Sequence, residues 1–443
     1  MWARVRAEMA GILGLALPIV VGLAASTLIG VTDSLMVAPL GAVALAAVGV
    51  TASALLIVTA AIWGMLSALS VRIGTAYGAR QGRRIPLILR NGLMLGLLAG
   101  CAGTAVMGGV WFLLPWLGQP EEVIAAMPAY WAMMALFIVP FSILTVFKSA
   151  FEAIGRPWLG TGLAFLGVVL NVPLNYALIW GIGPFPELGL AGAGAASLLA
   201  ESAALAVAWA FWAKARSTRR LRLRRGLDVT EIGAALREGA PLGLLYIAET
   251  GAMAVATLMI GTFGTVALAG NQVAFSVGGL LYMVPLGVAG AVAIRVAQAR
   301  GGGEGDRLRP IVLAALSMVS LWMTASALLL ALRGAEIAAL ITSDPAVITL
   351  AASIFAVFAV SQIMDGLQSS LLGALRGLSD TAWPATVSLV AYWAVALPGG
   401  WVLARLAGYG PTGIWMGFVV ALFGAALALA LRFWRQSALA VAM

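Results

Sequence analysis

Long apolar stretches and short polar breaks alternate along the whole chain. The stretches run without the period-two alternation of barrel strands, which is typical of membrane helices. A helix needs about 20 apolar residues to cross a bilayer. The pattern predicts twelve helices, over residues 10–37, 46–76, 87–115, 125–152, 157–181, 189–213, 238–262, 269–298, 309–333, 346–373, 382–405 and 411–434. The predicted fold class is therefore all-α integral membrane, with twelve transmembrane helices.

One motif occurs twice, once in each half of the chain: GAVALA at 41–46 recurs as GTVALA at 264–269. The same offset pairs Arg72 with Arg295, which we interpret as structural anchors at helix ends. Each copy holds six predicted helices, an even number, so both copies enter the membrane from the same side. Parallel repeats of this kind bind substrates between their halves near the membrane midplane. The predicted division is an N-terminal six-helix lobe (1–213), a basic cytoplasmic linker (214–237) and a C-terminal six-helix lobe (238–443).

Composition agrees with a surface that faces lipid. Hydrophobic residues make up 62% of the sequence and charged residues only 10%, against roughly 25% charged residues in a soluble domain. The net charge of +9 comes largely from basic residues in alternate loops and in the predicted linker, namely Lys214, Arg216, Arg219, Arg220, Arg222, Arg224 and Arg225. Short loops rich in Arg and Lys stay cytoplasmic. We expect a multi-pass protein of the bacterial inner membrane with both termini in the cytoplasm, in contact with lipid headgroups and without a nucleic-acid partner.

Polar residues inside predicted helices are the candidates for chemistry, because a charge there costs about 2.5 to 3.5 kcal/mol on insertion scales. Asp33 lies in the first helix, and Asn171 and Asn175 lie one turn apart on one face of the fifth. Pro173 between them removes an amide donor and loosens the helix. A backbone carbonyl that loses its hydrogen-bond donor in this way can instead coordinate a desolvated cation beside the polar face. A lone asparagine often holds two membrane helices together, so a structural role stays open for both amides.

The second half carries two further acids, Glu249 in the seventh helix and Asp365 in the tenth. Buried carboxylates without basic partners are protonated or hold a cation, which is what an ion-coupling site requires. Na⁺ is the metal ion that we consider at Glu249 and Asp365, since it prefers hard oxygen ligands. For Glu201 in the sixth helix, structural and functional roles are equally open. The secondary candidates for cation or substrate binding are Tyr246, Gln272, Tyr282, Gln362, Gln368 and Glu201.

Several function classes are excluded by what the sequence lacks. It contains no GxxxxGK[ST] motif to hold ATP phosphates, and no histidine for a metal site or a general base. The single cysteine, Cys101, permits no disulfide framework. No nucleophile and base stand together in a recognisable motif. We therefore expect no enzyme activity and no cofactor, and an ion gradient as the energy source.

Motifs in both halves resemble one known family. They are VTD at 31–33, LGAVALAA at 40–47, NVPLNYALI at 171–179, VALAGNQVA at 266–274, PLG at 285–287, RVAQ at 295–298 and LRG at 375–377. Together they are similar to the multidrug and toxic compound extrusion transporters, in their NorM-like branch, over nearly the whole chain. One departure is Asn271, where relatives commonly have histidine.

The resemblance implies two six-helix lobes in a V, with alternating access. It also implies that cationic drugs and Na⁺ or H⁺ bind at the family's acids and amides, which fall here on Asp33, Asn171, Asn175, Glu249 and Asp365. Glu201 corresponds to no family role. We expect the chain to act as a monomer.

Antiport of organic cations against Na⁺ or H⁺ is the leading hypothesis. The alternative is a lipid-linked oligosaccharide flippase of the same superfamily, which would need a cationic cavity for pyrophosphate, whereas the charges inside these helices are acidic. A channel fits less well because coupled acids on two mobile lobes do not suit a static pore. A membrane hydrolase lacks its nucleophile and base. The sequence leaves the choice between Na⁺ and H⁺ open.

Overall fold

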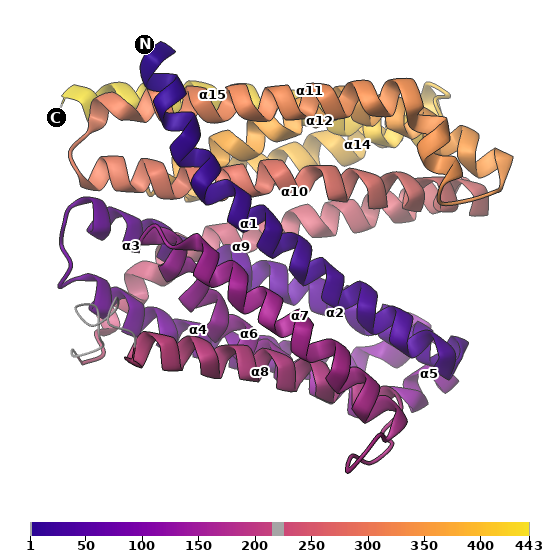
Figure 1. The fold of residues 1–443 in the computed structure, drawn as a ribbon. Coiled ribbons are helices and arrows are strands. Elements are labelled where there is room, and N and C mark those ends of the chain that lie inside the picture. The colour runs from indigo at the N-terminus through magenta and orange to yellow at the C-terminus, as the bar shows by residue number, and fades with distance from the viewer. Residues whose placement is uncertain (1, 215–225, 443) are drawn as a thin grey trace. The chain divides into compact units, whose positions relative to one another are not determined.

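The computed structural model describes residues 2–214 and 226–442, and nearly all of them are helical (Figure 1). Within these ranges, twelve helices are long and apolar enough to cross a membrane, and no strand occurs. The predicted all-α fold with twelve transmembrane helices is confirmed. The chain divides into two compact units, which we call the N-unit (Val21–Gly243) and the C-unit (Met1–Val20 with Leu244–Met443).

The elements follow one another in chain order. Those up to the predicted linker are α1 (Trp2–Val37), η1 (Ala38–Leu40), α2 (Ala42–Leu66), α3 (Ala68–Gly78), α4 (Ile85–Leu113), η2 (Leu114–Leu117), α5 (Glu121–Ala126), α6 (Pro128–Ala153), α7 (Pro157–Trp180) and α8 (Leu190–Lys214). Those after it are α9 (Val229–Gly261), α10 (Thr265–Gly301), η4 (Gly305–Arg307), α11 (Leu308–Ala339), α12 (Pro345–Gly377), α13 (Ala382–Val390), η5 (Ala391–Ala396), α14 (Leu397–Trp401), η6 (Val402–Leu406) and α15 (Pro411–Ala442).

Two helices begin well before their predicted starts. α1 begins at Trp2 rather than at residue 10, and α9 begins at Val229 rather than at residue 238. The charged residues of these first turns suggest a loop in the sequence, but ion pairs hold them in helices. Part of the predicted linker is therefore helical. Its basic residues Arg216, Arg219, Arg220, Arg222, Arg224 and Arg225 lie outside the described residues.

The second and eleventh predicted helices contain irregular turns. α2 and α3 belong to one membrane span but separate at Ser67, whose N–H donates to the carbonyls of Trp63 and Gly64 at 2.9 and 3.3 Å. The eleventh span contains two π-helical segments, η5 and η6, on either side of Pro398. Proline has no N–H for the helical ladder, and wider turns of this kind accommodate such a gap.

α6 is the central helix of the N-unit, where it packs against α2, α4, α7 and α8. Its Phe147 and Phe151 side chains are fully buried. Close approach to α4 depends on Gly100, because a Cβ there would lie 2.4 Å from Ser142 Oγ and 2.8 Å from Val139 Cα. Small residues allow membrane helices to pack this tightly.

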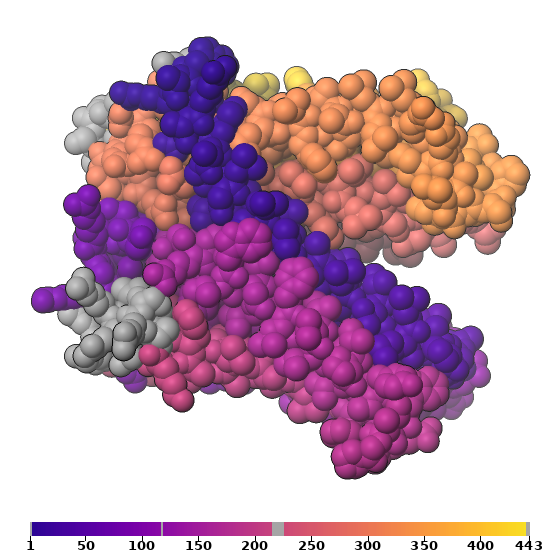
Figure 2. Space-filling model, in the orientation of Figure 1, coloured from indigo at the N-terminus to yellow at the C-terminus, as the bar shows by residue number. Residues whose placement is uncertain are grey.

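α12 is the central helix of the C-unit, where it packs against α10, α11 and α15. Its backbone approaches α10 so closely that a Cβ at Gly373 would lie 2.3 Å from the Ala289 carbonyl oxygen. Phe355 of α12 and Phe418 of α15 are fully buried in the core of this unit. The first turns of α1 also belong to the C-unit and lie against the end of α10 (Figure 2).

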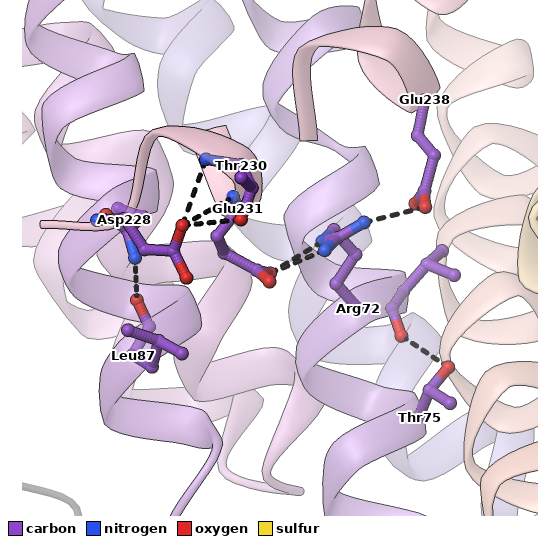
Figure 3. A network of polar contacts seen from close by, with 9 residues as sticks. Arg72, Thr75, Leu87, Asp228, Thr230, Glu231 and Glu238 are labelled. Carbon is purple, nitrogen blue, oxygen red and sulfur yellow. Dashed lines mark hydrogen bonds and ion pairs between the residues drawn. The ribbon is translucent and has the colours of Figure 1, made fainter. Parts of the chain in front are cut away.

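An arginine anchors the start of α9 in the N-unit. Arg72 of α3 lies between two acids of α9, 2.5 Å from Glu231 and 2.7 Å from Glu238 (Figure 3). Asp228, just before α9, accepts hydrogen bonds from the Thr230 hydroxyl at 2.5 Å and from the Thr230 N–H at 3.0 Å. These bonds, the hydroxyl bond first, lower the pKa of Asp228. The helix thus begins on a capped, ion-paired turn.

The equivalent arginine anchors the start of α1 in the C-unit. Arg295 of α10 lies 2.5 Å from Glu8, and Arg307 lies 2.8 Å from the other Glu8 oxygen. Glu8 and Glu231 are separated by the repeat offset, as Arg72 and Arg295 are. The repeat therefore preserves an ion pair as well as a sequence motif.

Candidate functional site

Four buried polar side chains from three helices meet in the N-unit. They are Asp33 of α1, Asn171 and Asn175 of α7, and Ser197 of α8, and none is more than 5% exposed. The two asparagines share a helix face because they are one turn apart. The structure thus brings together three of the four candidates that the sequence singled out in this half, and adds a serine; Glu201 lies outside this group.

The four side chains form a closed ring of hydrogen bonds, which we call the Asp33 ring. Asp33 Oδ1 accepts a bond from Asn175 Nδ2 at 2.6 Å, and Asp33 Oδ2 accepts one from Ser197 Oγ at 2.9 Å. Asn171 Nδ2 donates to Ser197 Oγ at 3.0 Å, and Asn171 Oδ1 accepts the second bond of Asn175 Nδ2 at 3.0 Å. Within the described residues, only neutral groups hold the Asp33 carboxyl group.

The ring also contains an unused acceptor. Asn175 Oδ1 is buried and has no hydrogen-bond partner among the described residues. Leaving such an atom without a partner costs about 1–3 kcal/mol. A proton donor or a hard cation at this point would satisfy it, since hard cations take carboxylate, amide and hydroxyl oxygens as ligands. The ring can therefore hold a proton on Asp33 or a small cation among its oxygens.

Sequence reasoning missed Ser197. Serine is common in membrane helices as a packing residue, so its type carried no signal. Its spacing did, because Ser197 lies one turn before Glu201 on the same face of α8. A search for polar residues one turn from an intramembrane acid would have found it.

Two acids and three tyrosines gather in the C-unit. Glu249 of α9 and Asp365 of α12 interact electrostatically, and both act on Tyr282 of α10 and on Tyr392 of η5. Tyr246, nearly one turn before Glu249, belongs to the same group. Sequence reasoning missed Tyr392, because a tyrosine beside a tryptophan suggests an anchor at the membrane interface.

Two glutamines of α12 flank Asp365 in the sequence. Gln362 and Gln368 are buried, three residues before and after Asp365. Gln368 Nε2 donates to Ser388 Oγ at 3.3 Å, while Gln362 Oε1 has no partner among the described residues. Among the residues that the structure describes, no group of three or more acids, histidines or cysteines could hold a metal ion. A cation at Glu249 and Asp365 would therefore need amide or phenol oxygens as well.

Three other residues lie in contrasting settings. Gln272 is exposed on α10. Asn271 is buried, and its Oδ1 accepts a hydrogen bond from Trp415 Nε1 at 2.9 Å. The predicted helix over 346–373 leaves Arg376 in the loop that follows it, but Arg376 lies in the last turn of α12 and is buried. This expectation was wrong because α12 continues to Gly377, where the arginine interacts with Tyr246.

Comparison with known proteins agrees with this architecture. The MatE family model matches residues 18–177 and 241–402. The probable multidrug resistance protein NorM of Deinococcus radiodurans is 36% identical, over 84% of this chain and 82% of that protein. The multidrug resistance protein PmpM of Pseudomonas aeruginosa is 31% identical, over 98% of this chain and 93% of its own length.

The fold is also that of solved MATE structures. A crystal structure of a MATE protein in its bent conformation matches with a TM-score of 0.90, over 99% of this chain and 97% of that one, at 19% identity. The structural match shows the shared fold, and the sequence matches cover both halves of the chain. This protein therefore belongs to the MatE family, which its motifs resemble.

Proposed function

We propose that this protein is a multidrug efflux transporter, which exports organic cations in exchange for H⁺ or Na⁺ by alternating access. The observation that carries the proposal is the Asp33 ring, a buried carboxyl group in a membrane span with only neutral hydrogen-bond partners among the described residues. An ionised acid at this depth is costly. Binding a proton or a cation removes most of that cost, so occupancy and release of the ion can drive a change of state.

The Glu249 and Asp365 group supplies the features that bind an organic cation. Two carboxylates offer negative charge, and Tyr246, Tyr282 and Tyr392 offer aromatic faces, which attract cations. A coupling ion that neutralises Glu249 or Asp365 would lower the affinity of the group for a cationic drug. Each elementary charge that crosses the membrane contributes about 2.3 kcal/mol per 100 mV, which supports a modest drug gradient.

Two alternatives are less well supported. A lipid-linked oligosaccharide flippase would bind pyrophosphate and would need several basic side chains around its cavity. The groups described above contain three acids, Asp33, Glu249 and Asp365, and one arginine, Arg376, which interacts with Tyr246. As a member of its family, the chain is a secondary transporter and not an enzyme.

Ethidium efflux from proteoliposomes tests the proposal. Purified protein is reconstituted, and Na⁺ and pH gradients are imposed separately. We expect one of the two gradients to drive ethidium against its concentration gradient. Failure of both, with protein that still binds ethidium, would contradict the proposed function.

We also propose that the chain works as a monomer in the bacterial inner membrane with both termini in the cytoplasm. The positive-inside rule supports this orientation. In a Cys101→Ala background, a cysteine at Gln81, which is exposed between α3 and α4, should resist an impermeant thiol reagent in intact spheroplasts. A cysteine at exposed Glu187, between α7 and α8, should react. The reverse pattern would overturn the orientation.

A further inference from the structure

One face of α7 carries a line of polar contacts that extends beyond the Asp33 ring. Gly160, Gly167, Asn171 and Asn175 are separated by seven, four and four residues. These spacings keep all four positions on one side of a helix. The asparagines lie in the Asp33 ring, and the two glycines leave room for charged side chains from neighbouring helices.

Glu201 of α8 occupies the space beside Gly167. A Cβ on Gly167 would lie 3.7 Å from Glu201 Oε2 and 3.8 Å from Ile29 Cδ1 of α1. Glu201 lies one turn beyond Ser197, so its carboxyl group is the next polar group along α8 after the ring. It is half-buried and takes part in no hydrogen bond or ion pair among the described residues. An acid that only held helices together would be bonded to one of them.

Lys148 of α6 stands farther along the same line. A Cβ on Gly160 would lie 3.5 Å from Lys148 Cα and 3.6 Å from its Cγ. Lys148 interacts electrostatically with Glu201. Among the described residues, the charged group that acts on Glu201 is Lys148 from α6. Asp33 of α1 lies on the other side of Ser197, and the four positions named on this face of α7 carry no titratable side chain. The line runs from Asp33 towards the beginning of α7 at Pro157, the end that we propose faces the cytoplasm.

We propose that Glu201 is a second proton-binding site, which carries the coupling proton between Asp33 and the cytoplasm. This inference rests on the proposed function and deepens it by naming the coupling ion and its exit. The proton on Asp33 passes to Ser197 Oγ as the serine gives up its own proton, and a water carries that proton to Glu201. Glu201 then releases it to cytoplasmic water, so one proton enters and one leaves. Four residues of α-helix rise about 6 Å, a separation that one bridging water spans.

Glu201 differs from Asp33 in its hydrogen bonding, and this difference suits the role of a relay. Asp33 is 5% exposed, and both of its carboxyl oxygens accept hydrogen bonds within the ring. Glu201 makes no hydrogen bond among the described residues, so its carboxyl group is not held in one state by a partner. Lys148 supplies the opposite charge once the carboxyl group has released its proton.

The test compares three variants in proteoliposomes under an imposed pH gradient. Glu201→Gln keeps the shape of the side chain but cannot bind and release a proton. It should slow pH-driven ethidium efflux by roughly 100-fold, the low end of what a positioned proton-transfer group contributes, and flatten its dependence on pH, with ethidium affinity unchanged. Glu201→Asp should recover part of the rate. Glu122→Gln, which neutralises an exposed acid of α5 in the same unit, should match the wild type.

Each other outcome has a definite meaning. A wild-type rate and pH profile in Glu201→Gln would overturn the relay. An equal loss of thermal stability and ethidium binding in Glu201→Gln and Glu201→Asp would assign the residue to structure and also overturn it. Wild-type transport driven by Na⁺ alone would overturn the relay but not the exporter. A wild type that neither ion drives would instead refute the proposed function.

Discussion

The first membrane helix of each repeat begins with a glutamate that pairs with an arginine, Glu8 with Arg295 in the C-unit and Glu231 with Arg72 in the N-unit. The acids deeper in the helices are not repeated. The repeat offset pairs Glu249 with Ser26, and it pairs Asp33 with an alanine, Ala256. The two units therefore share the contacts that hold their helices, while their polar sites differ.

The two units share their backbone architecture and differ in the polar groups that could bind ions or substrates. The backbone before α2 and before α10 is also nearly identical, with Gly41 at φ 106° and ψ 173° and Gly264 at φ 109° and ψ 177°. Only glycine adopts this conformation without strain. The N-unit adds a compact ring around one acid, which suits a small ion. The C-unit adds two acids among tyrosines, which suits a larger cation.

Loss of the Asp33 carboxyl group should be among the most damaging changes to transport. Asp33→Asn keeps the shape and the neighbours of the side chain but cannot bind and release a proton. We expect ion-driven ethidium efflux to fall by roughly 100-fold or more, with expression and thermal stability close to wild type. Efflux assays on everted vesicles measure this. Wild-type efflux from Asp33→Asn would assign the ring to structure.

Substitution of either acid of the C-unit should reduce ion-driven efflux much more than it reduces ethidium affinity. Glu249→Gln and Asp365→Asn should each abolish ion-driven efflux, because the remaining acid cannot reproduce the exchange of ion and drug. Ethidium affinity should fall by about tenfold or less, roughly 1.4 kcal/mol, since the aromatic faces remain. Fluorescence titration of purified protein gives the affinity. A larger loss of affinity than of efflux would reverse the roles assigned to the two units.

Spacing along the chain revealed only part of the sites. Asn171 and Asn175 could be placed on one face because they share a helix. Ser197 could not be joined to Asp33, because 164 residues separate them and only tertiary packing brings them together. The same holds for Tyr392, which meets Glu249 from another helix.

Local charge misled the prediction of helix starts. The first turns of α1 and α9 contain several charged residues, which resemble loop sequence when they are read alone. In the structure, each of these turns places a glutamate against an arginine that lies far away in the sequence. A buried ion pair of this kind can be recognised only when both partners are known. The apolar spans themselves were predicted because their length and composition are sufficient evidence.

The repeated anchors should affect stability rather than transport. Arg72→Met leaves Glu231 without its partner, and loss of one partner of a buried pair costs roughly 3–5 kcal/mol. Arg295→Met should cost less, because the Arg295 side chain is 23% exposed and that of Arg72 only 11%. Thermal unfolding in detergent measures both. Arg333→Met is the matched control, since its ion pair with Glu336 is highly exposed and exposed pairs contribute about 0–1 kcal/mol.

An equal loss of stability in Arg333→Met and Arg72→Met would mean that removal of any arginine has the same effect. The anchors would then have no special structural role, and the shared architecture of the two units would need another explanation.

The central claim is that binding of a coupling ion and binding of a cationic drug oppose one another in this protein. Equilibrium affinity for ethidium, measured on the purified wild-type protein against Na⁺ concentration and against pH, tests it most directly. We expect affinity to fall as the concentration of one of the two ions rises, and by linkage ethidium must weaken the binding of that ion by the same factor. An affinity that changes with neither ion would contradict the account, whatever the mutants do.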